Sequence, residues 1–340
     1  MYRWLPTAGP TALAITVKAR TAALGPRMLE VAVRMAAAEA TDRQASRFAK
    51  FDMHRRKTVK SLIEEASALT DSGDTDSALA KYFEALEIDI NHAAVHYDIG
   101  LIYKYRGAWK ESFKYNRRAA ELQPDDQASQ WNLAIAATAL RDWKTARAVW
   151  RGQGMKIEGE GPIEGNFGQT PVRLDPDGDA EVVWGRRLCP VHARIVSIPF
   201  PESEVAYGDV VLHDGAPVGY RCDADGNEKS VFNMLEMFEP GQHSTYVVDA
   251  VVDSPEQVKL LETLCDARQM TIEDWADNIQ VLCKACSEGR PHEQHDHRPM
   301  SKGWQRERRI AVAARDGHDL ETVLDVWTGE VRDLRIALER

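Results

Sequence analysis

A pattern that recurs every 34 residues constrains the fold of this 340-residue chain more than any other feature. Trp109 and Trp143 are one such period apart, and the positions around them match at the same offset. Equivalent positions in three successive units are Ala66, Gly100 and Ala134; Gly73, Gly107 and Arg141; and Ala78, Ser112 and Ala146. A period of this length, with small residues where two helices must approach closely, indicates pairs of short amphipathic helices. Residues 59–152 are therefore expected to form a stack of helical hairpins.

The middle unit, residues 93–126, resembles a tetratricopeptide repeat. The resemblance is carried by Ile99, Gly100 and Tyr103 in the first helix, Gly107 in the turn, Ser112 and Ala119 in the second helix, and Pro124 at the end. The flanking units keep part of the pattern, through Tyr82, Ala85, Leu133, Ala134, Ala146 and Trp150. Two positions depart from it, since Ile90 replaces a closing proline and Asn116 replaces an aromatic residue. The resemblance covers about three repeats and implies a helical-hairpin solenoid over residues 53–152.

The resemblance also implies that the first helices of the hairpins line a concave wall that binds a protein or peptide partner. The expected wall residues are Tyr97, Leu101, Tyr105, Trp131 and Ile135. Rigid aromatic side chains favour an extended or helical peptide, because they give a large contact area at a low cost in entropy. Family members that grip a terminal carboxylate carry Lys and Asn where Tyr97 and Leu101 stand here, so a receptor of that kind is not expected. The sequence leaves open whether the chain's own C-terminal domain covers the wall.

The composition divides the chain into four segments. Residues 1–52 form a basic extension, residues 53–152 hold the repeats, residues 153–168 form a glycine-rich linker, and residues 169–340 form an α+β domain. The first 60 residues hold 12 Lys or Arg against 4 acidic residues, about +8, which leaves about −18 for the remainder of a chain of net charge −10. Such an acidic body argues against a nucleic-acid partner. The extension is open to three interpretations: a frayed or artefactual leader, a helix packed on the first repeat, or a targeting peptide.

Membrane insertion and secretion are not expected from the sequence. No uninterrupted apolar run approaches the ~20 residues that a membrane-spanning helix needs, which argues against an integral membrane segment. The five cysteines all fall between Cys189 and Cys286, and no signal peptide precedes them. An odd number of cysteines in a long chain does not match a secreted disulfide framework, so a reducing, cytoplasmic environment is expected.

Beyond the linker, the helical period gives way to the alternation that predicts strands. The expected strands cover residues 181–184, 194–198, 209–212, 218–221, 244–252, 278–282 and 309–314, and the expected helices cover residues 231–237, 254–267 and 319–327. A turn at His213, Asp214 and Gly215 is expected to close a hairpin, and this interpretation is favoured over a catalytic role for the first two. Ser254 and Gln257 predict a capping box. The order of elements after residue 244 favours an α+β sandwich of ferredoxin-like type.

One cysteine- and histidine-rich loop is a candidate metal site. Its candidate ligands are Cys283, Cys286, His292, His295 and His297. Two thiolates separated by two residues can chelate one ion, and sulfur combined with imidazole nitrogen suits Zn²⁺. The spacing is shorter than in a zinc finger, so a polar loop without metal and a thiol redox pair are the alternatives. A bound zinc is expected to be structural, because four protein ligands are available and no paired carboxylate or nucleophile lies alongside.

The sequence favours a non-enzymatic interaction module, such as an adaptor or an immunity-type protein, that binds a partner through the repeat wall. The acidity beyond residue 60 suits a basic partner. The first alternative is a zinc-dependent enzyme that uses the loop from Cys283 to His297. The second is a structural protein whose C-terminal domain fills its own wall. No phosphate-binding loop, nucleophile elbow or zinc-protease helix motif occurs in the sequence, so catalysis has no positive support there.

Overall fold

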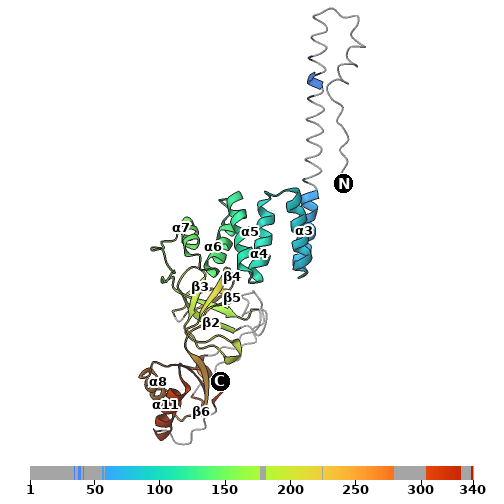
Figure 1. The fold of residues 1–340 in the computed structure, drawn as a ribbon. Helices are drawn as coiled ribbons and strands as arrows, with labels where there is room; N and C mark the ends of the chain where they lie inside the picture. Colours follow the sequence, from blue (N-terminus) through green and yellow to red (C-terminus); the bar gives the residue numbers. More distant parts are fainter. Residues whose placement is uncertain are drawn as a thin grey trace, which may run out of the picture. The chain divides into compact units, whose positions relative to one another are not determined.

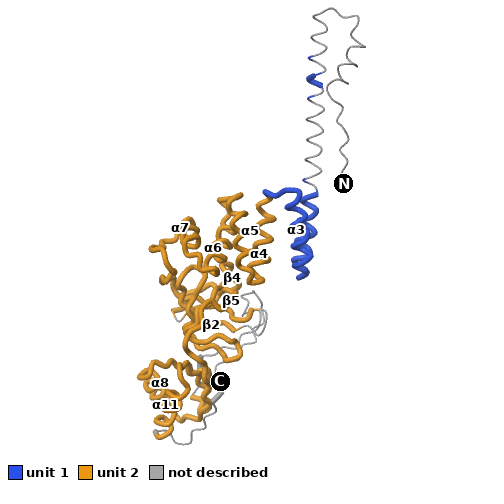
Figure 2. Tube along the Cα trace, in the orientation of Figure 1, with its two compact units in different colours: residues 1–91 blue, residues 92–340 orange. Residues whose placement is uncertain are grey.

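The computed structural model describes residues 58–176, 181–223, 225–278, 304–330 and 338–339, together with residues 34, 37–39, 41 and 56. The chain splits into two compact units, residues 1–91 and residues 92–340 (Figure 2). Residues 58–88 of the first unit form a helical hairpin, and the second unit contains further helices followed by two β-sheets (Figure 1).

The hairpin of the first unit pairs a helix over residues 58–71 with α3 (Thr75–Ile88). Gly73 makes the turn with a φ of +87°, a left-handed conformation that glycine adopts without a steric penalty. The Asp74 carboxylate accepts a hydrogen bond from the Ser77 N–H and thereby caps α3. Ala66 and Ala78 are fully buried, as expected for small residues at a close helix contact.

The second unit begins with two more hairpins, α4 (Ala93–Tyr105) with α5 (Trp109–Leu122) and α6 (Gln127–Ala139) with α7 (Trp143–Gly152). Their turns repeat the backbone of the first hairpin, because Gly107 has a φ of +65° and Arg141 a φ of +58°. The carboxylates of Asp126 and Asp142 cap α6 and α7. Neighbouring helices pack against each other in chain order. The helical hairpins predicted from the period are therefore confirmed.

The contact between α4 and α5 accounts for the unusual Asn116. An added Cβ on Gly100 would lie 2.5 Å from Asn116 Nδ2, so the two helices leave no space for a side chain at residue 100. Asn116 Nδ2 donates to the Ser112 carbonyl at 2.9 Å, and Ser112 Oγ donates to the Gly100 carbonyl at 3.0 Å. Two of the polar groups in this tight contact are thus satisfied within it.

Five strands form a closed barrel in the order β1-β2-β3-β4-β5. They are β1 (Gln169–Leu174), β2 (Glu181–Arg187), β3 (His192–Ile195), β4 (Val210–Cys222) and β5 (Glu228–Glu239). Consecutive strands are antiparallel, and the barrel closes through a parallel pairing of β1 with β5. Its apolar interior consists of Val172, Leu174, Val183, Ala193, Ile195, Val205 and Val211, with Met234 and Met237 packed against them.

The hairpin predicted at residues 213–215 is wrong. β4 runs through these residues as one strand, and its partner over the whole length is β5. Register shifts next to His213 and Pro217 mark β-bulges, which bend a strand without reversing it. Asp214 and Gly215, which suggested a turn, therefore lie in a strand with an irregular register.

The helix predicted at residues 231–237 is also wrong, because these residues belong to β5. Both faces of this strand are covered. Met234 and Met237 pack into the barrel interior, whereas Leu235 and Phe238 pack against the helical hairpins. Apolar residues on both faces, offset by the bulges, produce a spacing that resembles the helical period.

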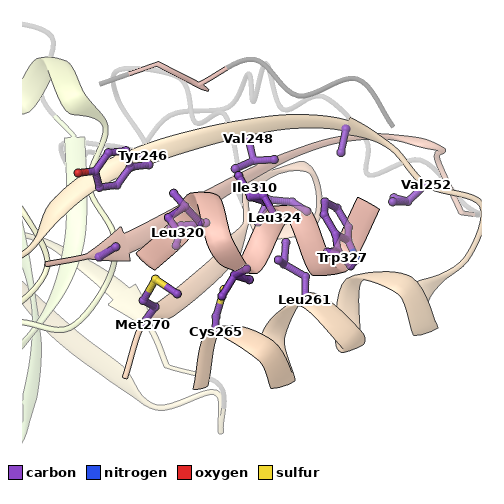
Figure 3. Close-up of a cluster of buried hydrophobic side chains, with 14 residues drawn as sticks. Tyr246, Val248, Val252, Leu261, Cys265, Met270, Ile310, Leu320, Leu324 and Trp327 are labelled. Atoms are coloured by element: carbon purple, nitrogen blue, oxygen red, sulfur yellow. The ribbon is translucent and has the colours of Figure 1, made fainter. Parts of the chain in front are cut away.

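The last part of the second unit is a four-stranded sheet in the order β7-β8-β6-β9, whose neighbouring strands are antiparallel. Its elements are β6 (Ser244–Val251), α8 (Pro255–Asp266), β7 (Thr271–Asp274), α9 (Trp275–Asn278), β8 (Glu307–Ala314), α11 (Gly317–Glu330) and β9 (Leu338–Glu339). Side chains of α8 and α11, among them Leu261 and Trp327, pack with Val248 and Ile310 of the sheet (Figure 3). A helical part followed by a sheet-containing α+β part is therefore confirmed.

Most of the elements predicted after residue 240 are found. β6, α8, β8 and α11 match the strands and helices expected there, with small differences at their ends. The predicted capping box is not formed, because the side chain of the N-cap residue Ser254 makes no capping hydrogen bond, and Gln257 Oε1 accepts at 2.7 Å from the N–H of Asp253, the residue before the cap. The strand predicted at residues 278–282 lies outside the described residues apart from Asn278, which ends α9.

Candidate interaction surface on the helical repeats

The five predicted wall residues lie on the first helices of the two hairpins in the second unit. Tyr97, Leu101 and Tyr105 follow one another at intervals of four residues on α4, and Trp131 and Ile135 do so on α6. This spacing puts each set on one face of its helix. Tyr105 is 62% exposed, Ile135 is buried, and the other three side chains are half-buried. The wall is thus more open at α4 than at α6.

Strand β4 covers the wall at α6. An added Cβ on Gly215 would lie 2.7 Å from Trp131 Cε3 and 3.7 Å from Ile135 Cδ1. β4 therefore approaches α6 closely enough that only a residue without a side chain fits at this point, and Figure 1 shows β4 next to α6. The two predicted wall residues of α6 are in contact with the chain's own barrel.

A buried ion pair joins α4 to the same strand. Lys104 Nζ lies 2.9 Å from Asp214 Oδ1 and 3.1 Å from Oδ2, and it also donates to Asn132 Oδ1 at 3.3 Å. The Lys104 and Asp214 side chains are only 3% and 7% exposed, so each neutralises a charge that would otherwise be costly to bury. Burial lowers the pKa of Lys104, and the Asp214 carboxylate opposes that shift.

Two tyrosines of the wall take part in this polar cluster. The Tyr105 hydroxyl donates to Asp214 Oδ2 at 3.0 Å, which fixes the ring although most of it is exposed. Although the residue as a whole is exposed, burial of its hydroxyl end and the Asp214 charge raise the Tyr105 pKa, so the hydroxyl stays protonated and able to donate. The Tyr97 pKa is raised mainly by burial, and a hydrogen bond to Asn132 opposes the shift.

Little in the sequence pointed to Lys104 or Asn132 as functional residues. A lysine in an amphipathic helix is ordinarily solvent-exposed, and its counter-charge here lies 110 residues away. One local signal was present, since Lys104 is three residues after Leu101 and therefore shares the face of the wall. Its burial depends on β4, which the sequence does not connect to the repeats.

His213 and Asp214 do not form a catalytic pair. His213 Nδ1 lies 2.7 Å from the backbone oxygen of Asp214, while the Asp214 carboxylate is held by Lys104 and Tyr105. Burial lowers the pKa of His213 to about 4, so the ring is neutral near pH 7. The ring stacks on Phe232 with 5.1 Å between centroids, which is the packing of a buried strand residue.

Further contacts join the hairpins to the barrel. Trp109 Nε1 donates to Glu236 Oε2 at 2.6 Å, and Arg141 Nη2 donates to the Phe238 carbonyl at 2.9 Å. One apolar cluster contains Ile135 and Trp150 of the hairpins together with Leu212 of the barrel. The hairpins of the second unit and the barrel therefore share a hydrophobic core.

The predicted zinc ligands cannot be compared with this geometry. Cys283, Cys286, His292, His295 and His297 all lie outside the described residues. Within the described ranges, no group of three or more His, Cys, Asp or Glu side chains is arranged to hold a metal ion. Zinc binding by this loop stays a prediction.

No protein-family model matches the chain, and no curated protein shows significant similarity to it. Among the helices of the described part of the chain, none combines the length and the apolar character needed for a membrane crossing.

Proposed function

We propose that this chain is a non-enzymatic interaction module that binds a basic peptide segment on the open part of the repeat wall. The proposal is carried by Tyr105, whose ring is 62% exposed on the wall while its hydroxyl is held by Asp214. An exposed ring in a fixed orientation loses little entropy when a partner binds. The repeated turns and helix caps support the finer assignment to tetratricopeptide-like repeats, a class that binds peptides along such a wall.

The chemistry of the surface favours a basic partner. Residues 61–340 carry a net charge of about −18, which attracts a cationic segment over long range. Exposed tyrosine rings also attract Lys and Arg side chains through cation–π contacts. Half-buried Tyr97 and Leu101 add apolar contact area beside Tyr105. The bound segment is therefore expected to combine Lys or Arg with apolar residues.

Selection from a peptide library on the full chain, followed by calorimetric titration of the selected peptides, tests the proposal. We expect Leu101→Ala and Tyr105→Ala to weaken binding at least tenfold, because central anchors of an interface contribute more than ~1.4 kcal/mol each. Tyr105→Phe keeps the ring and removes its hydrogen bond, so it should weaken binding less than Tyr105→Ala.

Tyr220→Ala is the matched control, because it removes an exposed tyrosine of β4 that does not belong to the predicted wall. Its affinity for the selected peptides should equal that of the wild type. Selected peptides that bind Leu101→Ala and Tyr105→Ala as tightly as the wild type would contradict the proposal.

A second candidate is a structural protein whose barrel fills its own wall. The Lys104–Asp214 ion pair and the packing of Gly215 on Trp131 favour it. Gly215→Ala distinguishes the candidates, because the added methyl group forces β4 away from Trp131. If the wall is a binding surface that β4 partly covers, peptide affinity should rise in this variant. In a purely structural protein, Gly215→Ala should lower only the melting temperature.

The proposal also includes a fold class and a role for the C-terminal sheet. Its order β7-β8-β6-β9 supports a ferredoxin-like class, since the described elements run strand–helix–strand, then the short α9, then strand–helix–strand. We assign it the role of a second protein-binding or stabilising surface. A zinc ion bound by Cys283 and its neighbours would stabilise the same part of the chain.

A further inference from the structure

Two arginines stand directly opposite each other on the outer face of the barrel. Arg186 of β2 pairs with Arg194 of β3 in the antiparallel register. Val183, Ala193 and Ile195 of the same strands point into the barrel, so the alternation of side chains puts both arginines outside. Like charges at directly paired positions are about 5 Å apart at their Cβ atoms and destabilise the sheet.

Among the described residues, no carboxylate forms an ion pair with either guanidinium. The hydrogen bond found for Arg194 runs from Nη1 to the Gly208 carbonyl at 3.4 Å. The Arg194 charge contributes to a lowered pKa of His192 on the same strand. Burial, reinforced by His213, Arg141 and Arg194, lowers the pKa of His192 to about 4.

A cavity of about 330 Å³ lies at the arginine pair. Its lining consists of Glu164, Gly165, Asn166, Arg186, Leu188 and Arg194. This volume is at the lower end of the range for small-molecule sites. The lining has a net positive charge, because two arginines stand against the single carboxylate of Glu164.

The loop that forms one side of the cavity is held in place by hydrogen bonds. The Gly165 N–H donates to the Leu188 carbonyl at 2.8 Å, and the Gly168 N–H donates to Asn166 Oδ1 at 3.2 Å. Arg187, which follows Arg186 on β2, donates from Nη2 to the Phe167 carbonyl at 3.0 Å. The cavity is therefore formed before any ligand arrives, which reduces the cost of binding.

We propose that this cavity binds a small dianionic oxyanion, inorganic phosphate or a phosphomonoester, between Arg186 and Arg194. Guanidinium groups donate paired, parallel hydrogen bonds to phosphate oxygens, and a dianion between two cations removes their mutual repulsion. The Glu164 carboxylate disfavours ligands with more negative charge, such as a triphosphate. Buried Leu188 offers an apolar contact for the organic part of a small ester. The site is separate from the repeat wall and does not depend on the function proposed for it.

Calorimetric titration of the full chain with inorganic phosphate and with glycerol 3-phosphate tests the site. The titrations are run at about pH 7.5, where phosphate is mainly dianionic, and at an ionic strength kept constant with sodium chloride. We expect saturable binding by the wild type, with an affinity that falls at least tenfold in Arg186→Gln and in Arg194→Gln. Lys156→Gln removes an exposed positive charge outside the cavity and should bind like the wild type. Circular dichroism of each variant establishes that it is folded.

Vesicles of phosphatidylcholine with phosphatidic acid separate a lipid headgroup from a free ligand. Arginine-dependent sedimentation with these vesicles, without binding of either soluble compound, would replace the small ligand by a membrane surface and overturn the proposal. Absence of saturable phosphate binding, or an equal loss in Lys156→Gln, would overturn it as well. Because the two arginine variants leave the repeat wall intact, peptide binding there should be unchanged whichever result is obtained.

Discussion

At the residue scale, the turn positions of the three hairpins show how one backbone conformation is kept by different side chains. Gly73 and Gly107 have φ values of +87° and +65°, and Arg141 takes the equivalent place with +58°. A left-handed backbone costs a non-glycine residue about 1 kcal/mol. Arg141 offsets this through its hydrogen bond to the Phe238 carbonyl and a guanidinium 4.3 Å from the Phe238 ring centroid.

Replacing Arg141 by Gly and by Ala separates these two effects. Both variants lose the contacts with Phe238, but only Ala keeps a Cβ in the left-handed conformation. We therefore expect Arg141→Gly to be about 1 kcal/mol more stable than Arg141→Ala in urea unfolding. Equal stabilities of the two variants would show that the turn relaxes to another conformation when the arginine is removed.

At the element scale, equivalent positions also control the starts of the second helices. Asp74 and Asp142 accept hydrogen bonds from the N–H groups three residues later, at 3.1 Å in each case. Ala108 has nearly the same backbone conformation as these two residues, but its side chain provides no cap for α5. The middle hairpin therefore lacks a stabilising contact that its neighbours have.

Ala108→Asp should restore the missing cap. Its carboxylate would accept a hydrogen bond from the Glu111 N–H, and we expect a gain of about 1 kcal/mol in the free energy of unfolding. Ala108→Asn should give a similar gain without adding charge, while Ala108→Leu should give none. Thermal unfolding of the three variants checks this, and a gain for Leu equal to that for Asp would rule out capping as the cause.

The hairpins and β5 show which elements can be predicted from the sequence and which cannot. The hairpins could be predicted because each depends on contacts within about 34 residues, such as Gly100 against Asn116. The strand β5 could not be predicted, because its apolar residues face both the barrel interior and the helices. The predicted wall residues were found on the two helices, but Lys104 was missed because β4 decides its burial.

At the scale of the whole molecule, a carboxylate of the C-terminal sheet bonds to the barrel part of the chain, and a second carboxylate of the barrel lies near it. Glu181 of β2 accepts a hydrogen bond from the Phe200 N–H at 3.1 Å, and Glu273 of β7 accepts one from the Ile198 N–H at 3.0 Å. Burial raises the pKa of both, to about 7 for Glu181, and the charges of Glu273 and Glu202 add to the shift at Glu181. The Phe200 ring packs against Trp275 in the same region, with 4.5 Å between the ring centroids and 59° between the ring planes.

This raised pKa makes stability depend on pH. Protonated Glu181 is favoured in the folded chain, so its contribution is fully present below about pH 4.5 and is lost as the pH rises through about 7. Glu181→Gln keeps an acceptor for the Phe200 N–H and removes the ionisation. Between pH 5 and pH 8 we expect the free energy of unfolding to decrease by on the order of 1–2 kcal/mol more in the wild type than in Glu181→Gln.

Urea unfolding at a series of pH values measures that difference. Glu228→Gln, which removes an exposed carboxylate from β5, is the control and should follow the wild type at every pH. Parallel pH profiles for the wild type and Glu181→Gln would show that Glu181 ionises in the folded chain as easily as in the unfolded one.

The separation of 110 positions between Lys104 and Asp214 in the sequence also has a consequence for synthesis. A ribosome adds about 5–20 residues per second, so α4 is made roughly 5–20 s before the strand that covers Lys104. During that interval the lysine remains hydrated and the wall is open along both α4 and α6. A nascent chain therefore presents a wider and more positively charged wall than the finished protein, and a ligand or chaperone that prefers this early form must bind before β4 arrives.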